Sequence, residues 1–118
     1  MRARRLRAFC LEFNDAAEEF PFGPETSVFK VAGKMFALCA LDADPLTVNL
    51  KCEPEIAVRL RADHPAAIAP GWHMNKRHWN TVTVGLLPDA MVRELIEDSY
   101  DLVVAGLPKA ARLRLDRP

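Results

Sequence analysis

The side chains best suited to chemistry gather in one segment, residues 71–82. It holds both tryptophans of the chain, two of its three histidines and a pair of adjacent cations. No Asp or Glu occurs from residue 64 to residue 88, although the whole protein balances 16 acids against 16 Lys and Arg. A neutral protein that clears one segment of acids has a local positive field there. The polar and aromatic members of the segment are Trp72, His73, Asn75, Lys76, Arg77, His78, Trp79 and Asn80.

These residue types fit contacts with nucleic acid. Lys76 and Arg77 can contact phosphates, and the amides of Asn75 and Asn80 can hydrogen-bond to sugar, phosphate or base edges. An exposed Trp72 would offer a surface on which bases stack. We therefore predict a nucleic-acid site formed by Trp72, His73, Asn75, Lys76, Arg77, His78 and Asn80.

Two alternatives stay open for the same residues. In the first, a buried tryptophan and a few solvated cations only begin a strand. In the second, the protein is a small-molecule or protein-interaction module in which Trp72, His73 and His78 line a pocket. A complex driven by phosphate contacts weakens steeply with salt, whereas a pocket complex hardly changes, so salt dependence separates the two functions.

The sequence contains none of the familiar catalytic or metal-binding motifs. It has no Gly-x-Ser-x-Gly, no His-Glu-x-x-His and no glycine-rich phosphate loop. His73 and His78 are five residues apart and do not share a helical face as a zinc pair would. Cys10, Cys39 and Cys52 form no Cys-x-x-Cys pair, which fits reduced, buried thiols. We expect no enzymatic activity, no metal and no cofactor.

Length and composition indicate one ordinary domain. The chain has 118 residues, of which 50% are hydrophobic, enough for a single core. No apolar run approaches the roughly 18–20 residues of a membrane span. Glu12, Asp15, Glu18 and Glu19 stand where the apolar core of a signal peptide would lie. We expect a cytoplasmic monomer without membrane contact. Because its net charge is zero, any binding of nucleic acid must come from a local patch.

Apolar spacing predicts a first helix after the N-terminal arginines, with one buried face at three- and four-residue steps. That face consists of Leu6, Phe9, Cys10, Phe13 and Ala17. The two prolines within residues 20–24 cannot continue a helix. We expect a short extended edge segment there, whose Phe20 and Phe22 pack onto the core.

Three strands should follow in an antiparallel meander. Residues 26–31 and 34–41 have strand composition and are joined by a tight turn at Ala32-Gly33. The second of these runs is apolar on both faces, which indicates a central strand that is covered on both sides. Residues 46–51 alternate apolar and polar side chains, as a half-buried strand does.

The second half of the chain predicts helix, strand, helix. Pro54 suits the first turn of a helix over residues 54–63, and residues 66–70 allow only a brief extended segment. Residues 79–84 form a strand in which Trp79 and Thr81 face one way and Asn80 and Val82 the other. We expect Trp79 to be mostly buried and Trp72 to be the more exposed tryptophan. The clearest helix begins at residue 89 and ends at a glycine cap.

These elements define an α+β fold. Its order is an N-terminal helix, the antiparallel meander, a helix, a further strand and a C-terminal helix, with the helices packed on one face of the sheet. Residues 1–108 form the single domain. Residues 109–118 are expected to be a mobile, basic C-terminal tail.

At this point the sequence resembles the MmcQ/YjbR family, small bacterial proteins commonly described as DNA-binding. The likeness runs in one register from the first helix to Pro108 and leaves out the first arginines and the tail. It rests on Phe20-Pro21-Phe22-Gly23-Pro24-Glu25-Thr26, Val28-Phe29-Lys30-Val31, Lys34-Met35-Phe36-Ala37, Leu50-Lys51-Cys52, Trp72-His73-Met74-Asn75-Lys76-Arg77-His78-Trp79-Asn80-Thr81-Val82, Ser99-Tyr100-Asp101-Leu102-Val103-Val104 and Leu107-Pro108.

The resemblance implies a compact α+β fold similar to that of CyaY and frataxin, and DNA binding by a double wing of strands. Carried onto this sequence, the DNA-binding residues are Asn75, Lys76, Arg77, His78 and Asn80. The family offers no established catalytic residues to carry over. The acidic patch that frataxin-like proteins use for iron is not evident here.

Overall fold

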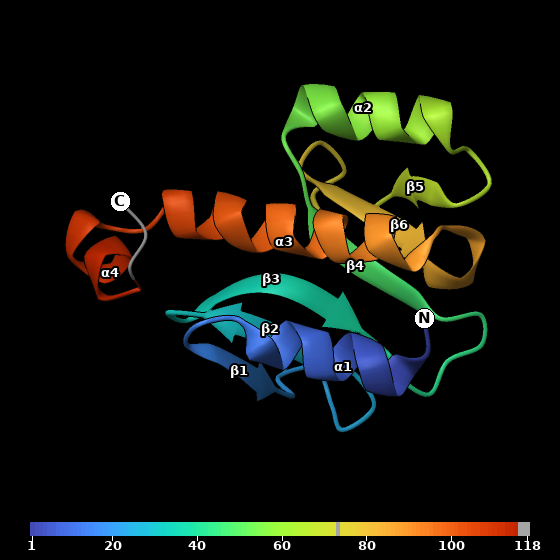
Figure 1. Ribbon diagram of the computed structural model, residues 1–118. Coiled ribbons are helices and arrows are strands. Elements are labelled where there is room, and N and C mark those ends of the chain that lie inside the picture. The colour runs from blue at the N-terminus through green and yellow to red at the C-terminus, as the bar shows by residue number, and fades with distance from the viewer. Residues whose placement is uncertain (73, 116–118) are drawn as a thin grey trace.

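The computed structural model describes residues 1–72 and 74–115 (Figure 1). One antiparallel sheet has the strand order β1-β2-β3-β4-β6-β5. The strands are β1 (Ala16–Glu19), β2 (Ser27–Val31), β3 (Lys34–Cys39), β4 (Thr47–Lys51), β5 (Ile68–Pro70) and β6 (Trp79–Thr83). The helices are α1 (Ala3–Glu12), α2 (Pro54–Asp63), α3 (Asp89–Ala105) and α4 (Lys109–Arg114), with a 3₁₀ turn η1 (Val84–Leu86). The predicted α+β class is confirmed.

The predicted meander forms the centre of the sheet. Ala32 and Gly33 both have positive φ, 49° and 78°, the conformation that a two-residue hairpin turn of type I′ requires. β4 then pairs with β6, so that Lys51 lies opposite Trp79 and Leu50 opposite Asn80. This pairing carries the start of β6 next to the end of β4, where the polypeptide turns into α2.

The helices cover one face of the sheet, as predicted. Figure 1 shows α3 running across the sheet, where it contacts β2, β3 and β4, while α2 contacts β5. Phe13 stacks on Tyr100 with ring centroids 4.6 Å apart, and Phe36 meets Tyr100 edge-on at 5.3 Å. Ser99 Oγ donates to the carbonyl of Phe36 and accepts from the N–H of Lys51, which ties α3 to two strands. The buried cluster includes Leu6, Cys10, Phe29, Phe36, Val48, Leu50, Val82, Ile96 and Tyr100.

The N-terminal third differs from the prediction in two places. The helix ends at Glu12, and Ala17 lies instead in β1, opposite Lys30 of β2. The chain can reverse so early because Asp15 adopts a positive φ of 61°. The following turn therefore projects beyond the end of the sheet. Phe20 and Phe22 are 50% and 69% exposed there, so the expectation that they pack onto the core was wrong.

The C-terminal segment was also predicted wrongly. Residues 109–114 form α4, which begins directly after Pro108, and Leu115 is buried in the main core. Arg112 donates to the carbonyl of Leu107 at 3.1 Å, and the amide of Asn14 donates to the carbonyl of Leu115. A single well-placed leucine thus anchors a segment that its basic composition had marked as a mobile tail.

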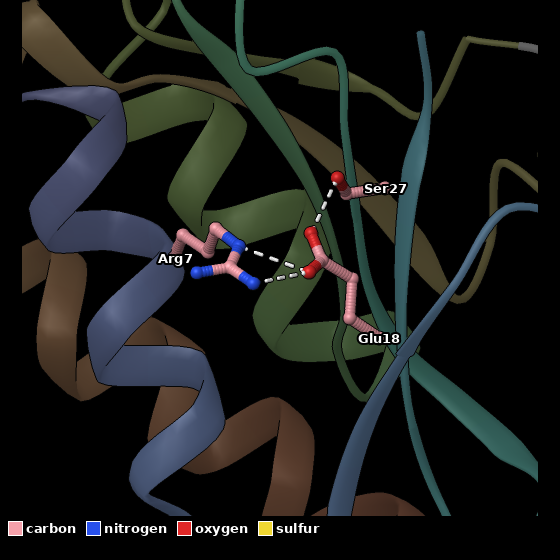
Figure 2. A network of polar contacts seen from close by, with 3 residues as sticks. All are labelled: Arg7, Glu18 and Ser27. Atoms are coloured by element: carbon pink, nitrogen blue, oxygen red, sulfur yellow. Dashed lines mark hydrogen bonds and ion pairs between the residues drawn. The ribbon is translucent and has the colours of Figure 1, made fainter. Parts of the chain in front are cut away.

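α1 is joined to the sheet by a small polar network (Figure 2). Arg7 donates through Nε to Glu18 Oε1 at 2.9 Å, and Ser27 Oγ donates to Glu18 Oε2 at 2.7 Å. The Glu18 side chain is 11% exposed. Burial by itself would raise the pKa of Glu18, but the hydrogen bonds from Arg7 and Ser27 and the guanidinium charge outweigh it and hold that pKa below its usual value. Arg7 is therefore engaged within the protein.

Candidate nucleic-acid interface

The segment between β5 and β6, residues 71–78, is called the basic loop below. Its backbone is closed by its own hydrogen bonds. The N–H of Gly71 donates to the carbonyl of Trp79 at 2.8 Å, and the N–H of Trp79 donates to the carbonyl of Asn75 at 2.9 Å. The side-chain oxygen of Asn75 accepts from the N–H of Arg77 at 3.0 Å, the bond of an Asx turn. These bonds hold the described residues of the basic loop to one another and to the start of β6.

Gly71 is buried and packs closely against Trp79. A Cβ atom at position 71 would lie 2.8 Å from the Cβ of Trp79, 3.0 Å from its carbonyl oxygen and 3.1 Å from the Cβ of Met74. Two of these atoms are Cβ carbons and the third is a backbone oxygen. None of them can move away by a side-chain rotation. Only glycine fits at this position without a shift of the basic loop.

Hydrogen bonds from β4, β6 and the residue after β4 anchor the basic loop. Thr81 Oγ1 donates to Asn49 Oδ1 at 2.6 Å and accepts from the N–H of Trp72 at 3.1 Å, which uses both capacities of the hydroxyl. On the other side, the carbonyl of His78 accepts from the N–H of Cys52 at 2.7 Å. Two neighbouring strands thus fix both ends of the basic loop.

The side chains divide between anchors and an outer surface. Trp72 is 70% exposed, whereas Trp79 is 8% exposed, which confirms the predicted assignment of the two tryptophans. Asn75, Lys76 and Arg77 are exposed as well. His78 is half-buried. His73 lies outside the described residues.

Asn80 does not belong to this surface, although the sequence placed it there. Its side chain is 2% exposed and lies on the helix-covered face of the sheet, opposite Leu50. The reason is strand alternation, since the pleat that turns Trp79 and Thr81 toward the basic loop turns Asn80 and Val82 the other way. The same alternation, applied strictly to the sequence, could have excluded Asn80 from the predicted site.

α2 adds a further cation to the surroundings of the basic loop. Lys76 and Arg77 line one wall of an open groove, and Pro54, Val58 and Arg61 line another. Glu55 is the acid in this groove. Sequence analysis did not predict that Arg61 lies near the basic loop, because only the turn between β4 and α2 brings the helix there.

The cysteines have the character of structural thiols. Burial raises the pKa of Cys10 and of Cys39 to about 12, so both stay protonated at neutral pH and are poor nucleophiles. Cys52 is half-buried, and burial together with nearby acids raises its pKa as well. Among the described residues, no group of three or more His, Cys, Asp or Glu side chains could hold a metal ion.

A cavity does exist in the protein, but the two described residues of the pocket alternative do not form it. It lies between α2, α3 and the strands β4 and β6, and neither Trp72 nor His78 lines it. In the part of the chain that the structure describes, no helix has the length and apolar character needed to cross a bilayer.

The fold and this surface define a class of protein: an α+β unit with one antiparallel sheet and helices on one face, which presents a basic, aromatic-bearing loop at the start of β6. The chain belongs to the YjbR family, whose model matches residues 11–102. The predicted resemblance is thereby confirmed.

Relatives and solved structures agree with this membership. Escherichia coli YbdF is 42% identical over 97 residues, which cover 81% of this chain and 79% of YbdF. Escherichia coli YjbR is 32% identical over 113 residues, 95% of each chain. A crystal structure from Deinococcus radiodurans superposes with a TM-score of 0.91 at 44% identity, covering 99% of this chain and 89% of that one. A Pseudomonas syringae structure has a TM-score of 0.74 at 28% identity over 86% of this chain and 98% of that one.

Proposed function

We propose that the protein binds DNA through the basic loop. The observation that carries this proposal is the exposure of Trp72, Lys76 and Arg77 on one loop whose two ends are held by hydrogen bonds. The Trp72 side chain is 70% exposed and presents a large apolar surface to water. Burial of such a ring against a binding partner is favourable. The two cations of the same loop supply the attraction to phosphate that a neutral protein otherwise lacks.

The preferred form of DNA follows from the stacking surface. A base inside an intact duplex has both faces covered by its neighbours, so Trp72 can stack only on a base that is unpaired or terminal. We therefore expect tighter binding to single strands than to duplex. Because the loop is held by hydrogen bonds before binding, little ordering entropy opposes the complex.

The salt dependence of binding tests the proposal. Fluorescence anisotropy with a labelled thymidine oligonucleotide would give the dissociation constant at several salt concentrations. Each phosphate contact to a single strand contributes a log–log slope of about 0.7, so Lys76→Ala with Arg77→Ala should flatten the slope by roughly 1 to 1.5. Trp72→Ala should weaken binding at every salt concentration and leave the slope unchanged.

A matched control removes the same charge elsewhere. Arg4→Ala with Arg5→Ala takes two exposed cations from α1 and should leave the slope of the wild-type protein. If both double variants flatten the slope equally, binding is unspecific electrostatics, and the assignment to the basic loop is wrong.

Several finer expectations remain predictions. These are the double wing, the likeness to CyaY and frataxin, and the monomeric state. We also infer a cytoplasmic location, since three free cysteines fit a reducing compartment.

A further inference from the structure

A cavity of about 430 Å³ lies between α2, α3 and the strands β4 and β6. Its wall is mainly apolar, and Leu50, Leu60, Val82, Leu95 and Leu102 contribute to it. Its volume falls within the range of ligand sites, which is roughly 300–1,000 Å³.

One wall residue presents an unused hydrogen-bond acceptor. The Oδ1 atom of Asn80 is buried and has no partner among the described residues, while Nδ2 makes only a long contact of 3.5 Å with the carbonyl of Ala57. A buried amide oxygen without a partner costs stability, and such atoms are few in native proteins. A leucine would fill nearly the same volume at this position without that cost. The amide therefore suits a donor that arrives with a ligand.

The rim of the cavity is acidic. Glu53, Asp98 and Asp101 line it against one cation, Lys51, and the ion pairs of the described residues do not include Asp98. Burial first, and then the neighbouring carboxylates of Glu94, Asp101 and Glu97, raise the pKa of Asp98. A cation next to Asp98 would relieve this repulsion, whereas an anion would increase it.

We propose that this cavity binds a small organic cation. The ligand class is a compact apolar or aromatic body that carries one N–H donor for Asn80 Oδ1 and a positive amine for Asp98 at the rim. The apolar wall selects the body, the buried acceptor orients it, and the acids select its charge. The cavity shares no lining residue with the groove beside the basic loop, and the proposal does not depend on DNA binding.

Tryptamine is a suitable probe, because it joins a ring N–H to an ammonium group on a flat apolar body. Titration of ¹⁵N-labelled protein would follow the side-chain amide resonances of Asn80. Tryptamine should shift them and saturate. Its ring N-methyl derivative lacks the donor, tryptophol lacks the charge, and indole-3-propionate reverses it. Loss of one neutral hydrogen bond weakens binding by about fivefold, so the ring N-methyl derivative should bind about fivefold more weakly than tryptamine. A contact between charged groups contributes more, so tryptophol should bind about tenfold more weakly or worse. Indole-3-propionate should bind weakest.

Two variants make the same test from the side of the protein. Asn80→Leu should reduce tryptamine affinity about fivefold and abolish the preference for tryptamine over its ring N-methyl derivative. It should also melt at or above the wild-type temperature, since it removes an unpaired acceptor. Asp98→Asn should abolish the preference for tryptamine over tryptophol. Glu94→Gln removes a charge from the same helix outside the cavity wall and should change affinity less than twofold.

Three results would overturn the proposal. The first is the absence of any shift at Asn80 with all four probes at millimolar concentration. The second is tryptamine binding that persists within twofold in both Asn80→Leu and Asp98→Asn. The third is a marked fall in the melting temperature of Asn80→Leu, because the amide would then be a structural group. An Asn80→Leu variant that does not fold counts as the third result.

Discussion

The two faces of β6 carry surfaces of different character. On one face, Trp79 and Thr81 hold the basic loop, which carries exposed cations and an exposed ring. On the other face, Asn80 and Val82 line a mainly apolar cavity with an acidic rim. Residues adjacent in sequence thus serve two surfaces of opposite charge, because a strand sends alternate side chains to opposite faces. A continuous motif need not be a continuous site.

Removal of the Trp79 side chain should have the largest effect on the unfolding free energy, because this side chain anchors the basic loop. Trp79→Ala deletes a side chain that is 8% exposed and packs against Gly71. Truncation of a buried tryptophan costs about 3–5 kcal/mol of unfolding free energy. Urea unfolding would measure this loss. A cost below about 1 kcal/mol, well under that range, would mean that Trp79 does not anchor the loop.

A methyl group at Gly71 should disturb the same contact with less damage. Gly71→Ala forces a Cβ to within 2.8 Å of Trp79, and overpacking of this kind costs about 1–3 kcal/mol. Gly85→Ala is the matched control, since a Cβ there would meet nothing within 4 Å. Thermal unfolding of both variants should show a clear loss only for Gly71→Ala. Equal losses would indicate that the close packing around Gly71 does not restrict the loop.

Replacement of Glu18, which is not in β6, should lower the unfolding free energy by less than the changes at Trp79 and Gly71, and this loss should depend on pH. Its pKa is lowered in the folded protein, so its stabilisation is present above the unfolded pKa and is lost as pH falls through the folded value. Glu18→Gln should cost about 1 kcal/mol at neutral pH, discounted because Arg7 is half-exposed, and the difference from wild type should shrink below about pH 4.

The neighbouring Glu19 is the control for that experiment. It pairs with Lys30 at 3.2 Å, but its side chain is half-exposed, and exposed pairs contribute little. Glu19→Gln should therefore change the unfolding free energy by less than about 0.5 kcal/mol. A pH-independent loss in Glu18→Gln would show that packing of the side chain matters, and that its charge does not.

Sequence analysis predicted the elements that carry strong local signals. The Ala32-Gly33 pair between two runs of strand composition identified the hairpin, and apolar spacing identified α2 and α3. The alternation of side chains in residues 79–83 predicted that Trp79 and Val82 lie on opposite faces of the strand. These features depend on neighbours within a few residues, so one sequence contains enough information to place them.

The features that were missed depend on tertiary contacts. β1 has the sequence Ala-Ala-Glu-Glu, which shows little strand propensity, and it forms because β2 offers a free edge. α4 is fixed by the burial of Leu115, a contact with residues about a hundred positions away. The cavity is formed by two helices and two strands that only the folded chain brings together. Neither the cavity nor Arg61 near the basic loop could be predicted from local patterns.

One titration tests the division of β6 most directly. ¹⁵N-labelled protein would be titrated with a thymidine oligonucleotide while backbone and side-chain amide resonances are followed. We predict saturable shifts for Trp72, Lys76 and Arg77 and no shift for the side-chain amide of Asn80, which lies on the far face of the sheet. Shifts that centre on Asn80 and α3, with the basic loop unchanged, would contradict the account.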